Sequence, residues 1–449
     1  MTEEIMIRLA LILMNILLFS LPPTAMAETG KRKITILYAG TALLVPGEKP
    51  SQNISIIIED GRISAIRDGF ITAETLKSPD SRVSFIDRRH SFIMPGFIDL
   101  HVHVSSGPKS DRSLTLKKPD SYLVFKAYQN AHKTLMAGFT TIRDLGSRGT
   151  LIFGLRDAIK DNLIAGPKII VAGSAITPTG GHGDVHGYRE EILHIMDDGN
   201  TCDGADDCRR AVRAMVKRGA DVIKVTATGG VLSETGTGTG QQFTQIELDT
   251  IAETAHWLGR KVTAHAHEKA GIEAALRAGF DSIEHAMWAD KDTMKLFKKT
   301  GAWLIPTAYP MTYVGDTPEK MKKGPFKNLP PVMMKKLLRI AGQPQKMTRL
   351  AHEMGVKIAL GTDSGVSPHG DNAQEFIEYV GIGMTPMEAL MAGTVNAAEA
   401  GGLLNVGRLV PGMAADIVAM AGNPLENITA VLELNLIMRD GITFKSSQE

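Results

Sequence analysis

The chain has 449 residues, of which 43% are hydrophobic, 22% charged and 5% aromatic. These proportions are typical of a soluble globular enzyme and exclude a disordered, collagen-like or membrane-embedded protein. The 50 Lys and Arg residues nearly balance the 49 Asp and Glu residues. The net charge of +1 argues against a nucleic-acid partner and against an electrostatic membrane anchor.

The chain begins with a segment that we leave out of the fold. Residues 7–21 are almost wholly apolar, Arg8 lies near their start, and Ala-Met-Ala at 25–27 matches a small-x-small cleavage site. This pattern predicts a signal peptide over residues 1–27, cleaved after Ala27. The protein would then be periplasmic or secreted, with no stable membrane anchor. The alternative is an uncleaved anchor helix, for which an apolar run of ~15 residues is short against a ~20-residue span.

The expected export bears on the state of the two cysteines, because exported proteins form disulfides. Cys202 and Cys208 lie in a polar loop before a predicted helix, in the segment DGNTCDGADDCRR. In an oxidising compartment they are expected to form a disulfide. A bare pair lacks the four ligands of a structural zinc site.

Strands are predicted at both ends of the mature chain. Alternating apolar residues separated by Gly, Pro and Asp-Gly turns occur in KITILYAGTALLV, NISIIIEDGRISAI, VSFIDRRHSFIMPG, GRLVPGMAADIVAM and AVLELNLIMRDGITF. We expect residues 33–94 and 402–447 to form one composite β domain, a small β-sandwich built from both ends of the chain.

Residues 95–401 show a different pattern, in which short apolar strands alternate with helical segments. The eight predicted strands are FIDLHVH, TTIRDLG, KIIVAG, VIKVTATGG, VTAHAH, SIEHA, WLIPTA and IALGTDSG. Helices between them include CRRAVRAMVKRG, QIELDTIAETAHWLG, AGIEAALRAG and MTRLAHEMG. This alternation predicts an α/β fold, a parallel (β/α)8 TIM barrel.

Ionisable residues occur where apolar ones are expected, near the carboxyl ends of five predicted strands: His101, His103, Lys224, His265, His285 and Asp363. Barrel enzymes place their chemistry at these strand ends. Six such groups at one mouth would be very unfavourable without a ligand, and a cationic metal centre removes that penalty. Imidazole and carboxylate ligands suit zinc, or alternatively manganese, iron or cobalt.

Two of the six positions have a particular spacing or chemistry. His101 and His103 point to the same side of a strand, because strand side chains alternate, so both can bind one metal. A buried Lys224 beside two dications would lose its proton readily. The neutral amine can add carbon dioxide to form a carbamate, which is an oxygen ligand able to bridge two metals. The alternatives are a surface strand for the histidines and a snorkelling lysine.

The motifs PGFIDLHVH, ADVIKVTATGG, VTAHAH, SIEH and LGTDSG together resemble those of the binuclear amidohydrolase superfamily. The resemblance covers nearly all of the mature sequence. It implies that His101, His103 and Asp363 hold the more buried metal and that His265 and His285 hold the second. Carboxylated Lys224 and a hydroxide would bridge the two metals. Asp363 would take the proton of the water and pass it to the leaving nitrogen.

Within the superfamily the chain resembles the Xaa-Pro dipeptidase and Xaa-Arg/Lys carboxypeptidase branch, also described as imidazolonepropionase-like. The supporting stretches are AGFTTIRDLGS, TPTGGHGD, ATGGVLSE, HAHEKAGIEAALRAGFDSIEH and GVSPHGDNAQEF. The same branch contains ochratoxin-type amidases. The shared reaction is hydrolysis of an amide bearing a terminal carboxylate.

Further residues are candidates for contacting the substrate. His182 is expected to polarise the substrate carbonyl, with a solvated loop histidine as the alternative. His267 replaces the tyrosine with which proline-selective relatives bind the substrate carboxylate, which puts proline specificity in doubt. It either binds that carboxylate or packs in the core. Backbone N–H groups of Gly229 and Gly230 could bind an anion. His369 either lines the pocket or caps a turn.

The stretch from 309 to 346 is long for a barrel loop and is rich in Met, Pro and Lys. It reads as a lid or as a solvated helical insertion. Its Met-rich part suits an apolar leaving residue. Its lysines, Lys320, Lys322, Lys323 and Lys327, disfavour a cationic one if they face the pocket.

The sequence is compatible with four candidate functions. The first is a carboxypeptidase or dipeptidase acting on dipeptides or short peptides. The second is an amidase acting on N-acyl amino acids or ochratoxin-like aryl amides. The third is a mononuclear deaminase or cyclic-amide hydrolase, against which Lys224 argues, and the fourth is a scaffold that would have lost ligands. The expected partner is a small molecule or peptide, and a homo-oligomer is possible.

Overall fold

The computed structural model describes residues 33–76, 82–108, 113–233 and 238–447, so the predicted signal peptide lies outside the described residues. The strands are β1 (Lys33–Ala42), β2 (Ser51–Glu59), β3 (Arg62–Asp68), β4 (Arg82–Pro95), β5 (Phe97–Val102), β6 (Phe139–Asp144), β7 (Lys168–Val171), β8 (Val222–Thr226), β9 (Lys261–Ala266), β10 (Ser282–His285), β11 (Trp303–Ile305), β12 (Ile417–Met420), β13 (Leu434–Arg439) and β14 (Ile442–Ser446).

The helices are α2 (Leu114–Lys117), α3 (Asp120–Met136), α4 (Leu151–Lys160), α5 (Glu190–Met196), α6 (Ala205–Arg218), α7 (Gln245–Trp257), α8 (Lys269–Arg277), α9 (Lys291–Thr300), α10 (Tyr309–Val314), α11 (Pro318–Met321), α12 (Pro331–Arg339), α13 (Gln343–Glu353), α14 (Gln374–Gly381), α15 (Pro386–Ala392) and α16 (Val395–Gly401), with short 3-10 turns η1 (Ala73–Leu76) and η2 (Ile428–Leu432). Within the described part of the chain, no helix has the length and apolarity needed to cross a membrane.

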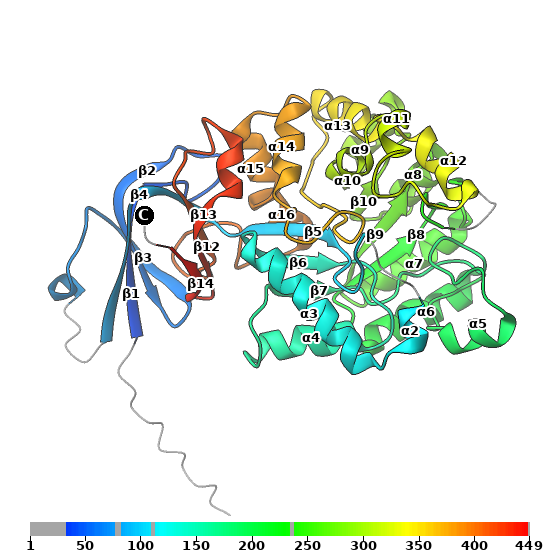
Figure 1. Cartoon of the computed structure of the whole chain (residues 1–449), viewed down its shortest axis with the longest axis horizontal. Coiled ribbons are helices and arrows are strands. Elements are labelled where there is room, and N and C mark those ends of the chain that lie inside the picture. Colours follow the sequence, from blue (N-terminus) through cyan, green and yellow to red (C-terminus); the bar gives the residue numbers. More distant parts are fainter. Residues whose placement is uncertain (1–32, 77–81, 109–112, 234–237, 448–449) are drawn as a thin grey trace, which may run out of the picture.

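Both ends of the chain join in one seven-stranded mixed sheet, in the order β14-β13-β12-β4-β1-β2-β3 (Figure 1). Strand β1 runs parallel to β4, and the other neighbours are antiparallel. The predicted sandwich is wrong in that the strands form one sheet instead of two. A bridge from Arg62 to Ala414 brings the β3 edge back to the segment before β12, which curls the sheet around an apolar core.

Two tight hairpins of this sheet follow directly from the sequence. Asp60 and Gly61 connect β2 to β3, and Asp440 and Gly441 connect β13 to β14. All four residues have positive φ, between 48° and 77°. Asp-Gly tolerates this conformation in a two-residue turn, and the turn's twist matches that of the strands.

The predicted alternation of strands and helices is confirmed for seven parallel strands. They form two sheets, β5-β6-β7 and β11-β10-β9-β8. Single parallel bridges link the sheets and the segment after α13: Ile176 with Val225, Leu304 with Ile358, and Val102 with Ser364. The predicted eighth strand, 358–365, therefore makes isolated bridges only, and the expectation of a regular strand there is wrong.

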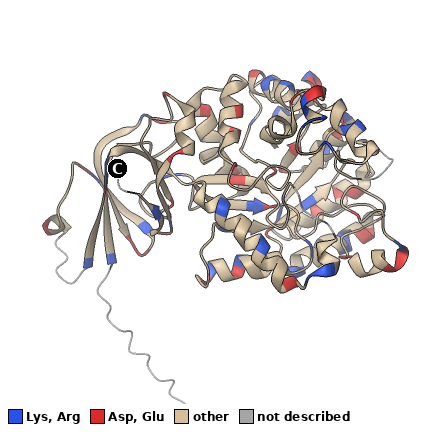
Figure 2. Ribbon diagram, viewed as in Figure 1, with Lys and Arg blue, Asp and Glu red and all other residues tan. Residues whose placement is uncertain are grey.

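Helices surround these parallel strands, while the seven-stranded sheet lies to one side (Figure 1). The largest apolar cluster lies between the strands and the helices and includes Val225, Phe139 and Leu248. On the ribbon, acidic and basic residues are interspersed along the helices (Figure 2). The fold thus places buried strands at its centre and mixed charge at its surface.

Candidate metal centre

Strand β5 carries the first two predicted ligands to its carboxyl end. All six residues of β5 are buried. The Nδ1 atom of His101 lies 2.7 Å from Oε2 of Glu284, and its Nε2 atom lies 3.3 Å from Nε2 of His103. A carboxylate on one ring nitrogen orients the other towards a metal. His101 therefore presents Nε2 to the same point as His103.

Asp363 reaches that point from the opposite end of the barrel sequence. Its Oδ1 atom lies 3.5 Å from Nε2 of His101 and 3.3 Å from Nε2 of His103. The backbone N–H of Asp363 donates to the carbonyl of His101 at 2.7 Å. One ligand atom each from His101, His285 and Asp363 lies within 4.8 Å of the others, which is close enough to hold one metal ion. The three predicted positions thus converge.

The backbone at several strand ends is strained. His285, Ala286, Thr307 and Asp363 are non-glycine residues with φ between 50° and 69°. His285 is the last residue of β10, Ala286 and Thr307 follow β10 and β11, and Asp363 lies in the 358–365 segment. Such conformations cost of order 1–3 kcal/mol each and concentrate at functional sites. Strain at two ligand positions supports a site shaped for binding.

His265 and His285 form the second predicted pair. Their ring centroids are 4.7 Å apart, and both side chains are buried. His285 Nδ1 lies 2.7 Å from the hydroxyl of Thr307. Nε2 of His265 is buried and has no hydrogen-bond partner among the described residues. An orphaned buried nitrogen costs about 1–3 kcal/mol. A metal bound at that atom would remove the penalty, so the donor set fits a metal.

Lys224 lies in the middle of β8, whose five residues are all buried. Burial is the main cause that lowers the pKa of Lys224 to about 8, and the charge of Arg143 adds to the effect. Glu284 and Asp363 act in the opposite direction. With a pKa of about 8, a minor fraction of the amine is already neutral at pH 7, so the chemistry required for carbamate formation is accessible at this position.

Glu284 is a buried carboxylate that sequence reasoning missed. Besides His101, it accepts a hydrogen bond at 2.9 Å from Arg143, whose Nε donates to the carbonyl of Leu100 at 2.6 Å. Burial raises the pKa of Glu284, but the charges of Arg143 and His101 outweigh burial and hold it at about 2. A charged residue within the buried strand SIEH was the available signal.

Asp99 is a second missed residue. Its carboxylate accepts hydrogen bonds from the N–H of His101 and from the N–H and hydroxyl of Thr362, at 2.6–3.0 Å. Asn372 donates a further hydrogen bond at 2.7 Å. Asp99 therefore ties the strand that carries His101 to the segment that carries Asp363. Its signal was an acidic residue inside the apolar run FIDL.

His182 lies beside the histidine cluster, as predicted. Its ring centroid is 4.4 Å from that of His265. Its backbone N–H donates to Oε1 of Gln242 at 2.9 Å. A Cβ atom at Gly230 would come within 2.1 Å of Cε1 of His182. Only glycine allows the backbone to pack against the imidazole in this way.

The anion-binding role predicted for the neighbouring Gly229 is wrong. The N–H of Gly229 donates to the carbonyl of Gly240 at 2.9 Å, so it is not available to an anion. A Cβ atom at Gly229 would come within 2.2 Å of the carbonyl oxygen of Gly238. Gly229 therefore serves the close approach of two backbone segments.

His267 completes the cluster. Its ring centroid lies 4.4 Å from that of His265 and 5.0 Å from that of His285. Its buried Nδ1 has no hydrogen-bond partner among the described residues. Burial is the main cause that lowers the pKa of His267 to about 3, and the charges of Lys224 and Lys336 add to it. A neutral imidazole with an unused nitrogen is suited to a ligand contact.

His369 has protein partners at both ring nitrogens. Nε2 lies 3.2 Å from the carbonyl oxygen of His103 and 3.1 Å from that of Ser106, and Nδ1 lies 3.4 Å from the hydroxyl of Thr134. These contacts favour the turn-holding alternative over the pocket-lining one. His369 thus braces the loop that follows the His101 strand.

The long stretch after β11 folds into α10, α11 and α12. Its apolar side chains pack in one cluster with Val231, Met287 and Val366, which lie in or near the loops after β8 and β10 and the 358–365 segment. Lys320, Lys322, Lys323 and Lys327 are all exposed. The insertion therefore covers loops at the strand ends, and these four lysines face solvent.

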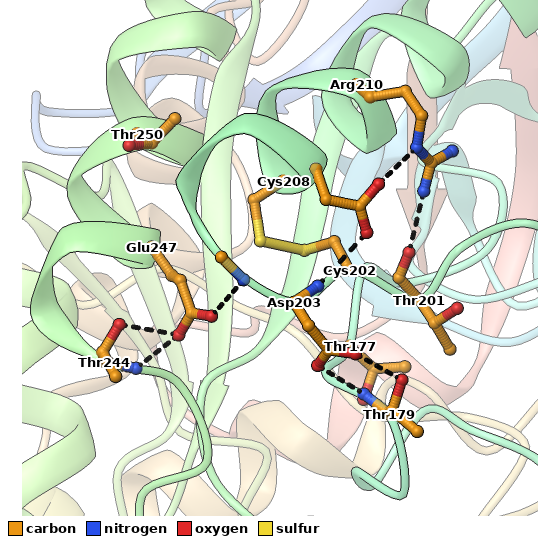
Figure 3. Close-up of a disulfide and its surroundings, with 12 residues drawn as sticks. Thr177, Thr179, Thr201, Cys202, Asp203, Cys208, Arg210, Thr244, Glu247 and Thr250 are labelled. Carbon is orange, nitrogen blue, oxygen red and sulfur yellow. Dashed lines mark hydrogen bonds and ion pairs between the residues drawn. A yellow bond between two sulfur atoms is a disulfide. The ribbon is translucent and has the colours of Figure 1, made fainter.

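The predicted disulfide between Cys202 and Cys208 is present (Figure 3). The N–H of Cys202 donates to the carbonyl of Thr177 at 3.0 Å, and Asp203 accepts hydrogen bonds from Thr179 at 2.6 and 3.2 Å (Figure 3). Thr177 and Thr179 open the loop that carries His182. The crosslink therefore anchors that loop to the start of α6.

Known proteins are similar to this chain in sequence and in fold. The amidohydrolase family matches residues 92–442. Ochratoxinase of Aspergillus niger is 34% identical over 432 residues, which cover 92% of this chain and 86% of the relative. Its crystal structure has a TM-score of 0.78 at 32% identity, covering 93% of this chain and 96% of that chain. A Xaa-Pro dipeptidase with methionine bound in its active site has a TM-score of 0.83 at 34% identity, covering 92% of this chain and 100% of that chain. The chain therefore belongs to the amidohydrolase family and is an enzyme acting on amide bonds.

Proposed function

We propose that this protein is a metal-dependent amide hydrolase that releases a C-terminal amino acid from dipeptides, short peptides or N-acyl amino acids. The observation that carries the proposal is the convergence of His101, His285 and Asp363 on one point, next to buried His265 and Lys224. His101, His103 and Asp363 would hold one divalent ion and His265 and His285 a second, with carboxylated Lys224 as a further ligand. The position of His285 within 4.8 Å of ligand atoms of His101 and Asp363 is compatible with two ions close together. Zinc is the expected metal.

Bound divalent ions would supply activation of water and polarisation of the amide carbonyl. The protein's own groups do the rest. Asp363 accepts the proton of the attacking water and delivers it to the leaving nitrogen, so that the amine departs neutral. His182 donates a hydrogen bond to the carbonyl oxygen as negative charge develops there. Glu284 and Asp99 hold His101 and the Asp363 segment in register.

The solved relatives support a carboxylate-bearing product. The Xaa-Pro dipeptidase was solved with a free amino acid, methionine, in its active site. The apolar cluster formed by Met311 and Met321 of the α10–α12 insertion with Met287 of the loop after β10 is compatible with an apolar leaving residue.

A second candidate function is hydrolysis of aryl amides of amino acids. It is favoured by the 34% identity to ochratoxinase over 92% of this chain. The two candidates share the released C-terminal amino acid and differ in the acyl group. A cyclic-amide hydrolase stays the remaining alternative.

Three further proposals concern architecture and location. We propose that β5–β11 and the 358–365 segment close into a (β/α)8 barrel over residues 95–401, which the single bridges between the sheets support. Residues 33–94 and 402–447 would then form the second domain. Export after cleavage at Ala27 is supported by the disulfide, because disulfides persist in oxidising compartments.

The function is tested with the purified, metal-replete protein and a library of Xaa-Xaa dipeptides, N-acyl amino acids and aryl amides of amino acids. Lys224→Ala serves as the control that lacks the bridging ligand. Release of a free C-terminal amino acid by the unmodified protein alone is the expected result. No release across the library by protein that binds two metals would contradict the proposal and favour cyclic amides.

A further inference from the structure

One lysine of the insertion, unlike the four exposed ones considered above, binds the loop that follows β8. Lys336 lies in α12, and its Nζ donates to the carbonyl of Gly230 at 2.8 Å and to that of Ser233 at 2.6 Å. Its side chain is half-buried, while its neighbour Lys335 is exposed. Lys336 thus joins the insertion to the loop that follows β8.

Short contacts connect Lys336 to the candidate ligands. Gly230, whose carbonyl it binds, packs directly against the ring of His182. The ring centroid of His182 is 4.4 Å from that of His265. The charge of Lys336 also acts on His267, the residue considered for carboxylate recognition. The ammonium therefore binds the residue that packs against His182 and lies near enough to His267 for its charge to act there.

The charge of Lys336 has no protein counterpart in the described part of the chain. Other basic residues of the insertion have one: Arg339 pairs with Glu268 at 2.9 Å, and Lys320 pairs with Asp316 at 2.8 Å. Lys336 binds backbone carbonyls and the Ser233 hydroxyl only. Burial lowers its pKa, and no carboxylate of the described residues raises it. A half-buried cation without a counter-charge is expected beside an anion.

We propose that Lys336 binds the carboxylate of the amino acid that the enzyme releases. An ammonium has three donors, and its two short contacts hold the carbonyls of Gly230 and Ser233. The contact with the Ser233 hydroxyl is longer, at 3.4 Å, so an incoming carboxylate oxygen can take its place. The inference rests on the proposed function, since it needs a substrate with a terminal carboxylate. It makes the α10–α12 insertion a part of substrate selection.

The test compares two substrates that differ in charge alone: the best acyl amino acid from the library and its C-terminal carboxamide. The unmodified enzyme is expected to prefer the carboxylate. Lys336→Met should lower kcat/KM for the carboxylate by about 10- to 100-fold, mostly through KM, with little change for the carboxamide. Lys336→Arg should retain most of the preference, and Lys335→Met should behave like the unmodified enzyme.

Inhibition by the released amino acid gives a second measure. Its inhibition constant should rise in Lys336→Met by a similar factor, while that of its amide should not change. Equal losses for both substrates would show that Lys336 only positions the loop, which overturns the inference. A preference for the carboxylate that survives in Lys336→Met also overturns it. An unmodified enzyme that cleaves both substrates equally would overturn the terminal-carboxylate part of the proposed function as well.

Discussion

The seven-stranded sheet and the parallel strands use buried positions differently. The core of the seven-stranded sheet is apolar, with residues such as Ile56, Leu37 and Leu436 fully buried. The parallel strands bury His101, Lys224 and other ionisable groups at equivalent depth. Apolar burial stabilises by roughly 25 cal/mol per Å2, whereas buried charge destabilises unless it is paired or ligated. The seven-stranded sheet therefore uses its buried positions for packing, whereas the parallel strands combine a large apolar core with the buried ionisable residues of the candidate site.

The largest expected effect is on activity. Asp363→Asn removes the proton acceptor and should lower kcat by about 100- to 10,000-fold, the range for general acid–base catalysis. The melting temperature of the metal-free protein should change little, because Asp363 is partly exposed and does not pack in a core. Steady-state kinetics, with metal content measured on the same samples, check the prediction. A kcat within tenfold of the unmodified value, with two metals bound, would contradict the assigned role.

The second effect is on stability and on metal affinity. Arg143→Met leaves Glu284 buried without its cationic partner and should cost about 3–5 kcal/mol in the free energy of unfolding. Metal affinity should fall about 10- to 100-fold, because Glu284 orients His101. Denaturant unfolding and metal titration measure the two quantities. If Arg143→Met keeps full stability, the pair does not stabilise the strands as described.

The third effect is a loss of stability in the seven-stranded sheet without a loss of activity. Ile56→Ala leaves a cavity in an apolar core and should cost about 2–5 kcal/mol. Values of kcat and KM should stay unchanged under conditions where the protein is folded. Ile56→Val is the matched control, with an expected cost of about 0.5–1.5 kcal/mol. A clear change in kcat for Ile56→Ala would show that the two regions are coupled more closely than their cores suggest.

The smallest effect concerns pH and metal removal. The pKa of Lys224 is lowered to about 8, so the neutral amine increases about tenfold per pH unit up to pH 8 and levels off above it. Recovery of activity by chelated protein, after addition of zinc and carbon dioxide, should accelerate in the same way between pH 6 and 8. Recovery is followed at constant dissolved carbon dioxide. A rate independent of pH over that range would argue against carbamate formation.

Local pattern was sufficient to locate most of the fold and the six candidate ligands. Strand ends could be recognised because His101, His265 and Asp363 interrupt apolar runs. The curled single sheet and the irregular 358–365 segment could not be predicted from the sequence, because they depend on how strands distant in the sequence pair. Periodicity reports which face of a strand is buried, and it does not report whether neighbouring strands pair continuously.

The missed residues are those defined by a distant partner. Arg143 and Glu284 are 141 positions apart, and Lys336 meets Gly230 across 106 positions. A lone charged residue in the sequence is most simply read as exposed, as it is for Lys335. Gly229 was misassigned for the same reason, since its N–H donates to Gly240 in a loop whose path the sequence does not specify.

The disulfide between Cys202 and Cys208 has a practical consequence for producing the enzyme. A recombinant chain made in a reducing cytoplasm would leave both thiols free, and the segment that carries His182 would lose one of its anchors. Two preparations whose chains differ in mass by only two hydrogen atoms could then differ in turnover. Thiol titration before each assay, and expression in an oxidising host compartment, would make specific activities comparable between laboratories.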